Sequence, residues 1–205
     1  AEHTIGLMLS LVRHIPQAHV SLHENKEWQR KLFSGTELKG KTLGIVGFGR
    51  IGQEVAKRAK AFGMTVFAND HAASLEVADA LEVELHPLDT LLAESDIITL
   101  HLPCTDETRN LFNKTTLKKC KPGTLIINAA RGGIVEENDL AQLIESGHIG
   151  GAAFDVFAEE PTPADNPLLK LPQVVAVPHL GASTAEGQFR AGQEAADIII
   201  EFAKG

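Results

Sequence analysis

The chain has 205 residues, of which 43% are hydrophobic and 22% are charged, proportions that are ordinary for a globular protein and too apolar for a disordered one. Its 27 acidic side chains outnumber its 19 basic ones, and the net charge of −8 argues against nucleic acid or an anionic membrane as a partner. No apolar run is long enough to span a bilayer. The two cysteines, Cys104 and Cys120, have no metal or redox spacing, so we expect no metal site and a cytoplasmic protein with free thiols.

The first 35 residues contain a helical part and a polar part. Residues 1–20 predict a largely apolar helix, in which Pro16 marks either a kink or the last turns. Residues 21–35 are polar and irregular, and their large apolar side chains, Trp28 and Phe33, could pack on the chain itself or on a second subunit. The chain starts without Met and without an N-cap, so we expect it to be part of a longer protein.

A strand, a glycine turn and a helix then follow one another without a gap. Residues 43–46 predict a buried strand, and residues 53–62 carry apolar side chains at helical spacing. Between them lies Gly47-Phe-Gly-Arg-Ile-Gly52, in which the first glycine allows a tight turn, the second a close pyrophosphate and the third close helix packing. The motif alone is weak evidence, but its position between strand and helix predicts phosphates bound at the helix N-terminus.

The next predicted strand, residues 65–68, is followed by a carboxylate in the position expected for a ribose partner. Asp70 lies roughly 20 residues beyond the glycines, the usual spacing of the acid that binds the ribose hydroxyls in this motif. A carboxylate would repel a 2′-phosphate, and residues 69–75 contain no Arg or Lys to bind one. The sequence therefore predicts NAD as the cofactor.

The remaining chain alternates between strand and helix patterns. The predicted helices cover residues 74–80, 88–93, 114–120, 137–146 and 184–204, and the predicted strands cover residues 82–85, 96–101, 124–128, 151–155 and 174–177. This alternation indicates the α/β class, with one doubly wound parallel sheet of the Rossmann type and no second domain.

Several polar residues fall at the predicted carboxyl ends of strands, where open parallel sheets bind ligands. They are His101, Arg131, Asp155, Glu160 and His179. Each also has an ordinary interpretation: a surface ion pair, a loop carboxylate, a strand cap or a local hydrogen bond. The other histidines look like ordinary surface or boundary residues; they are His3, His14, His19, His23, His71, His86 and His148.

Three of these residues together suit the oxidation of a 2-hydroxy acid by a nicotinamide. Arg131 offers a planar donor fork to the substrate carboxylate and carbonyl. His179 can exchange the hydroxyl proton, and Glu160 can fix its tautomer and stabilise the imidazolium.

These residues and motifs resemble the D-isomer-specific 2-hydroxyacid dehydrogenases over essentially the whole chain. The similar segments are Gly47-Phe-Gly-Arg-Ile-Gly52, Asn128-Ala-Ala-Arg-Gly-Gly133, Phe154-Asp-Val-Phe-Ala-Glu-Glu-Pro161 and Pro178-His-Leu-Gly-Ala-Ser-Thr184. The resemblance implies catalytic roles for Arg131, Glu160 and His179. It implies cofactor contacts from Gly47, Gly49, Arg50, Ile51, Gly52, Asp70, Leu102, Ala129, Asp155, His179 and Gly181.

The resemblance also implies what surrounds the chain. Residues 1–205 would form the NAD-binding domain, with crossing helices at about 1–20 and 184–205 and with the substrate domain absent. We therefore expect cofactor binding with poor turnover, and a homodimer formed through the polar arm. The amino-acid sequence of residues 178–184 favours 3-phosphoglycerate and 3-phosphohydroxypyruvate, the substrate pair of serine biosynthesis, over lactate or glycerate.

Two alternatives stay open. One is another D-2-hydroxyacid reductase, acting on hydroxypyruvate or glyoxylate, and the other is an NADH-sensing transcriptional corepressor of the same fold. A formate-specific member is disfavoured, because the resemblance implies a glutamine in that subgroup at the position where this chain has Glu160.

Overall fold

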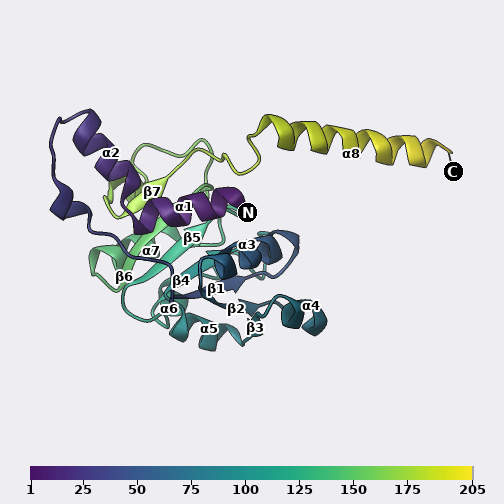
Figure 1. Ribbon diagram of the computed structural model, residues 1–205, viewed down its shortest axis with the longest axis horizontal. Helices are drawn as coiled ribbons and strands as arrows, with labels where there is room; N and C mark the ends of the chain where they lie inside the picture. The colour runs from purple at the N-terminus through teal and green to yellow at the C-terminus, as the bar shows by residue number, and fades with distance from the viewer. Residues whose placement is uncertain (205) are drawn as a thin grey trace.

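A single parallel sheet organises the protein, and the computed structural model describes it over residues 1–204 (Figure 1). The strand order is β3-β2-β1-β4-β5-β6-β7. The strands are β1 (Thr42–Val46), β2 (Thr65–Asn69), β3 (Glu84–Leu85), β4 (Ile97–Leu100), β5 (Thr124–Asn128), β6 (Ile149–Phe154) and β7 (Val174–Ala176). All seven strands predicted from the sequence are present, and the predicted doubly wound sheet is confirmed.

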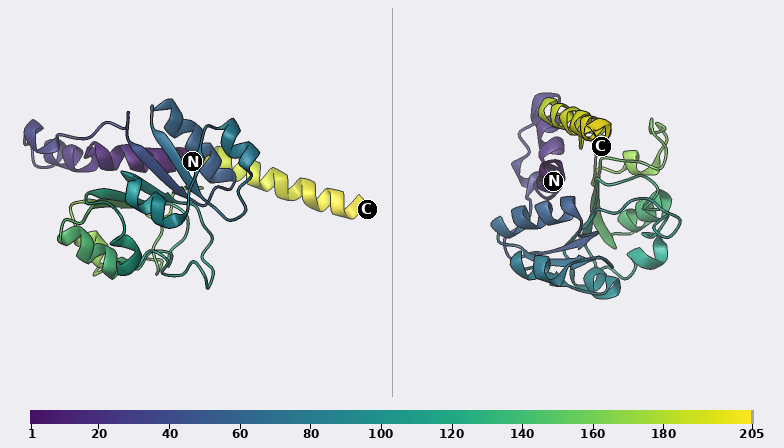
Figure 2. Two further views of the ribbon diagram at one scale, coloured as in Figure 1. Left: turned by 90° about the horizontal axis from the view of Figure 1, so that it is seen from below. Right: turned by 90° about the vertical axis from the view of Figure 1, so that its right-hand side faces the viewer.

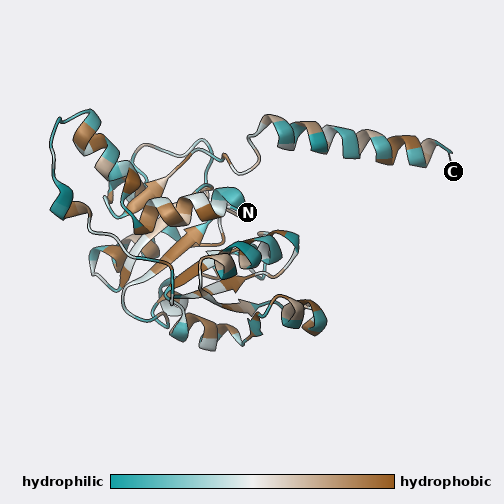
Figure 3. Ribbon diagram, viewed as in Figure 1, coloured by the Kyte–Doolittle hydropathy of each residue, from teal (hydrophilic) through white to brown (hydrophobic). Residues whose placement is uncertain are grey.

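Helices cover both faces of this sheet, as Figures 1 and 2 show. Their bounds are α1 (Glu2–Val12), α2 (Ile15–His23), α3 (Arg50–Ala61), α4 (Leu75–Ala80), α5 (Leu88–Glu94), α6 (Lys114–Leu117), α7 (Glu137–Glu145) and α8 (Ala185–Lys204), with short 3-10 helices η1 (Arg30–Phe33) and η2 (Pro167–Lys170). Alternate strand residues enter different cores, since Ile45 packs with α1 and α3 whereas its neighbour Val46 packs with α5 and α7. Hydrophobic strands between two helical layers are visible in Figure 3.

The binding crevice of such a sheet lies where the chain winds off in two directions. Here that point is between β1 and β4, whose last residues Val46 and Leu100 are paired in register. The chain proceeds from β1 through β2 to the edge at β3, and then from β4 to the opposite edge at β7. The glycine turn after β1 therefore opens at the switch point, where ligands of this fold class bind.

The N-terminal helix differs from the single helix predicted for residues 1–20. It breaks between α1 and α2, because His14 adopts a left-handed backbone conformation with φ of 53°. Pro16 lies in the first turn of α2, where its missing N–H group costs no helical hydrogen bond. Pro16 therefore neither kinks the first helix nor marks its last turns.

Two segments extend from the body without a covered apolar face. The polar arm, residues 21–35, leaves Trp28 81% exposed and contains the short helix η1. Helix α8 projects away from the sheet, and none of its described residues is buried (Figures 1 and 2). It matches the closing helix predicted for residues 184–204, and Gly205, the last residue of the predicted crossing helix at 184–205, lies outside the described residues. In residues 1–204 no helix has the length and hydropathy needed to cross a membrane.

Candidate active site at the carboxyl edge of the sheet

The glycine turn is constrained by its own backbone at two positions. Gly47 has a φ of +96°, and a Cβ there would lie 2.4 Å from the carbonyl oxygen of His101. A Cβ at Gly52 would lie 2.3 Å from the carbonyl oxygen of Gly47. The predicted tight turn at Gly47 and the predicted close packing at Gly52 are therefore confirmed. Leu102 lines the same turn, with its Cδ2 atom 3.1 Å from the position of a Cβ on Gly47.

The middle glycine is free of such constraints and faces open space. A Cβ built on Gly49 meets no atom of the described residues within 4 Å. Gly49 is the N-cap of α3, and the first hydrogen bond of that helix joins Gln53 N to Gly49 O. The N–H groups of Arg50 and Ile51 come before that bond and point out of the helix start. A pyrophosphate fits this arrangement, because a side chain at Gly49 would fill the space that it needs.

Asp70 is held beside the glycine turn by backbone donors. Its Oδ2 atom accepts a hydrogen bond from Phe48 N at 2.7 Å, and its Oδ1 atom accepts one from Ala72 N at 2.8 Å. The carboxylate thus fastens the end of β2 to the turn and keeps lone pairs for the hydroxyls of a ribose. The predicted position of this acid next to the glycines is confirmed.

The loop after β5 presents Arg131 and is fixed by the buried side chain of Asn128. Asn128 donates from Nδ2 to the carbonyl oxygen of Arg131 and accepts from Ala130 N. Gly132 follows, where a Cβ would lie 1.7 Å from the carbonyl oxygen of Phe157. The two loops that carry Arg131 and Glu160 are therefore in direct backbone contact. The guanidinium of Arg131 is exposed and donates to the carbonyl oxygen of Ala130 at 2.6 Å.

The turn after β7 carries His179, whose backbone has a left-handed φ of 55°. Such a value is uncommon outside glycine and needs support from the surrounding structure. Asp155, at the end of β6, supplies that support. Its carbonyl oxygen accepts from His179 N at 2.8 Å, its Oδ1 atom from Leu180 N at 2.6 Å and its Oδ2 atom from Gly181 N at 2.9 Å.

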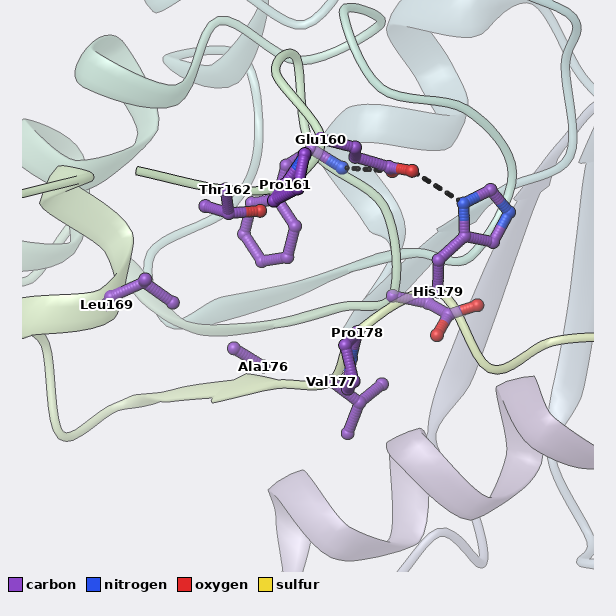
Figure 4. Close-up of a pocket in the computed structure, with 10 residues that line it drawn as sticks. Glu160, Pro161, Thr162, Leu169, Ala176, Val177, Pro178 and His179 are labelled. Carbon is purple, nitrogen blue, oxygen red and sulfur yellow. Dashed lines mark hydrogen bonds and ion pairs between the residues drawn. The ribbon is translucent and has the colours of Figure 1, made fainter. Parts of the chain in front are cut away.

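His179 and Glu160 form the closest functional pair in the site. The Nδ1 atom of His179 lies 2.7 Å from Oε2 of Glu160 (Figure 4). The hydrogen bond from His179, followed by one from the backbone of Phe157, lowers the pKa of the Glu160 carboxyl below its usual value. With Nδ1 held by a carboxylate, Nε2 is left to exchange a proton with a substrate. The pair borders a cavity of about 630 Å³ lined mainly by apolar side chains, including Leu169 and Val177.

His101 lies at the same edge but is turned inward. Its Nε2 atom is 3.0 Å from the hydroxyl of Thr99, and burial lowers the pKa of its ring to about 4. This is the local hydrogen bond that the sequence left open as an alternative. His101 is therefore neutral near pH 7, and it supports the turn at Gly47 through its carbonyl oxygen. Ala129 follows the end of β5 and is partly exposed.

The structure thus brings together two of the three predicted catalytic residues. Glu160 and His179 are in contact, whereas Arg131 shares their edge of the sheet but, within residues 1–204, is hydrogen-bonded only to its own loop. Sequence reasoning gave no role to Asn128 or Glu137. Glu137 accepts from Ala158 N and from the Asn166 amide, and so anchors the proline-rich loop. In the described part of the chain no three His, Cys, Asp or Glu side chains gather as a metal site would require.

The amino-acid sequence of the chain is similar to those of known proteins. Residues 5–181 match the family model for the D-isomer specific 2-hydroxyacid dehydrogenase, NAD binding domain. The chain is 50% identical over 205 residues to a D-3-phosphoglycerate dehydrogenase of Bacillus subtilis (strain 168), covering 100% of this chain and 39% of the relative. It is 53% identical over 199 residues to a D-3-phosphoglycerate dehydrogenase of Mycobacterium bovis, covering 97% of this chain and 37% of the relative.

Among solved structures, one similar protein is the D-lactate dehydrogenase of Aquifex aeolicus complexed with NAD and lactic acid. Its TM-score is 0.88 at 30% identity, and the match covers 100% of this chain and 66% of that one. The chain spans well under half the length of the two D-3-phosphoglycerate dehydrogenases, 39% of one and 37% of the other.

Proposed function

We propose that the chain takes part in hydride transfer between NAD and a D-2-hydroxy acid. It belongs to the D-isomer-specific 2-hydroxyacid dehydrogenase family, and it matches the model of that family's NAD-binding domain. The family resemblance stated from the sequence and the NAD prediction are both confirmed. We propose 3-phosphoglycerate and 3-phosphohydroxypyruvate as the substrate pair, since the two curated relatives are D-3-phosphoglycerate dehydrogenases.

The observation that supports this proposal most strongly is the hydrogen-bonded pair of His179 and Glu160. The substrate hydroxyl would give its proton to Nε2 of His179, while Glu160 accepts a hydrogen bond from Nδ1–H and so stabilises the imidazolium that forms. Arg131 would bind the substrate carboxylate and carbonyl oxygen through its guanidinium. NAD, when bound, would accept the hydride from the substrate carbon.

The proposed cofactor contacts follow the edge of the sheet. The N–H groups of Arg50 and Ile51 would bind the pyrophosphate, and Asp70 the adenosine ribose. Leu102 and Ala129 would line the loops over the cofactor, and Asp155 would accept from the nicotinamide amide.

The proposed domain arrangement treats α1 and α8 as crossing helices into and out of a substrate domain. The exposed apolar residues of α8, such as Phe189 and Phe202, support this arrangement, because they would be covered by such a domain. Catalysis needs both reactants held in one closed cleft. We therefore expect the 205-residue chain to bind NADH and to oxidise it poorly with phosphohydroxypyruvate.

Calorimetry tests the cofactor part of the proposal. NADH should bind the chain at least tenfold more tightly than NADPH, since Asp70 would repel the 2′-phosphate; tenfold corresponds to about 1.4 kcal/mol. Tighter binding of NADPH would contradict the assignment. Robust steady-state NADH oxidation with phosphohydroxypyruvate would contradict the expectation of poor turnover.

Two other functions remain compatible with this domain: a hydroxypyruvate or glyoxylate reductase, and an NADH-sensing corepressor. A substrate panel on the longer protein separates them. A phosphoglycerate enzyme should prefer the phosphorylated substrate, a reductase should prefer hydroxypyruvate or glyoxylate, and a sensor should bind NADH tightly and turn over slowly.

We further propose that the chain forms a homodimer in the cytoplasm through its polar arm. Trp28 is 81% exposed and Leu32 69% exposed, a large apolar area for a segment that is otherwise polar. Sedimentation at micromolar concentration should give a dimer for the wild type and a shift toward monomer for Trp28→Ala. Leu75→Ala is the matched control, because Leu75 is 71% exposed on α4, away from the arm. A monomeric wild type would contradict the proposal.

A further inference from the structure

His3, which the sequence marked as an ordinary boundary histidine, faces the candidate site from helix α1. Its Nε2 atom lies 3.0 Å from Oδ1 of Asp155. That nitrogen is itself buried and has no well-aligned hydrogen-bond partner among residues 1–204, so the Asp155 carboxylate is the polar group that it meets. Helix α1 is fixed in place by Met8 and Leu11, both buried against the sheet. His3 is therefore presented to Asp155 by a rigid element, although 152 positions separate the two residues in the sequence.

The Asp155 carboxylate needs such a neighbour because it is 1% exposed. Burying a polar group costs free energy unless protein groups replace the water that it loses. Leu180 N and Gly181 N provide two donors, one to each oxygen. The His3 ring adds a third group on the Oδ1 side, which leaves the remaining acceptor capacity of the carboxylate on Oδ2.

The contact is also packed closely against the turn that carries His179. A Cβ at Gly181 would lie 3.0 Å from Oδ2 of Asp155 and 3.9 Å from Cδ2 of His3. Asp155 in turn holds the strained backbone of His179 through its carbonyl oxygen. The position of the His3 ring therefore bears on the orientation of the carboxylate and on the turn beside it.

We propose that His3 is a positioning residue for the nicotinamide end of the cofactor. It holds the Asp155 carboxylate through Oδ1, in the orientation in which Oδ2 can accept a hydrogen bond from the nicotinamide carboxamide. The inference rests on the proposed function, in which Asp155 lies beside that carboxamide. The Gly47–Gly52 turn and Asp70 bind the other end of the cofactor and do not depend on His3.

Two ligands separate the two ends of the cofactor in a calorimetric experiment on the 205-residue chain. NADH carries the nicotinamide, and ADP-ribose has the same adenosine, pyrophosphate and second ribose without it. His3→Leu should weaken NADH binding about tenfold and leave ADP-ribose binding within about twofold, because the polar group that meets Oδ1 of the buried carboxylate is lost. His3→Gln, which can place an amide N–H near the position of Nε2, should restore most of the NADH affinity.

The matched control is His19→Leu, which removes an exposed histidine ring from α2 and should change neither affinity. The amide resonances of Leu180 and Gly181 give a second readout without ligand, and they should shift in His3→Leu but not in His19→Leu. Equal weakening of NADH and ADP-ribose by His3→Leu, or no weakening of NADH, would overturn the inference while the proposed function stands. If the wild type binds neither ligand, the proposed function fails and the inference falls with it.

Discussion

Replacing Gly49 with valine is expected to lower NADH affinity at least about a hundredfold, equivalent to about 2.7 kcal/mol, while the fold stays intact. The reason is the open space at this position, where a Cβ meets nothing within 4 Å in the described structure. The backbone at Gly49, with φ of −74° and ψ of −165°, is extended and suits any residue. A valine side chain would instead occupy the approach to the N–H groups of Arg50 and Ile51, where the pyrophosphate is proposed to bind.

Two measurements on Gly49→Val separate binding from folding. Calorimetry with NADH gives the affinity, and chemical denaturation should give an unfolding free energy within about 1 kcal/mol of wild type, the size of a lost helix cap. Gly192→Val is the control, since a Cβ there also meets nothing within 4 Å among the described residues, and α8 projects away from the sheet that carries the turn (Figure 1). Wild-type NADH affinity in Gly49→Val would remove the glycine turn from the proposed cofactor site.

The sequence predicted the sheet because its signals are local. The strand at 43–46, the glycine turn and the helix after it are adjacent, and the handedness of parallel connections leaves few ways to assemble such units. The order of strands and helices also predicts that Asp155 and His179, which follow the ends of parallel strands, lie at one edge of the sheet. Periodicity and turn chemistry thus sufficed for the fold and for placing these polar residues at one edge of the sheet.

Contacts between distant segments could not be predicted in this way. The interaction of His3 with Asp155 depends on how α1 lies across the sheet, and no pattern within either segment encodes that packing. The break at His14 also had no signal, because a left-handed conformation is uncommon for histidine, and Pro16 was interpreted only as an interruption of one helix. The partners of Asn128 and Glu137 were missed for the first reason, since both residues act on backbone groups of neighbouring loops.

The largest loss of stability is expected from Gly132→Ala, which should lower the free energy of unfolding by about 3 kcal/mol and the melting temperature by roughly 10 °C. A Cβ at this position would lie 1.7 Å from the carbonyl oxygen and 2.3 Å from the carbonyl carbon of Phe157. Both atoms belong to the backbone, so no side-chain rotation can relieve the overlap. One of the two loops must move.

Neither loop can move without breaking a buried or charged hydrogen bond. Asn128 holds the Arg131 loop, while Glu137 holds Ala158 and Glu160 holds Phe157 on the opposing loop. A shift of the second loop would also carry Glu160 away from His179, so the variant should lose the hydrogen bond of the proposed acid–base pair together with stability. Gly123→Ala is the matched control: its φ of +85° gives backbone strain of about 1 kcal/mol, but its Cβ would meet no atom of residues 1–204 within 4 Å. If Gly132→Ala costs no more free energy of unfolding than Gly123→Ala in thermal and chemical unfolding, the two loops are not locked together by this backbone contact.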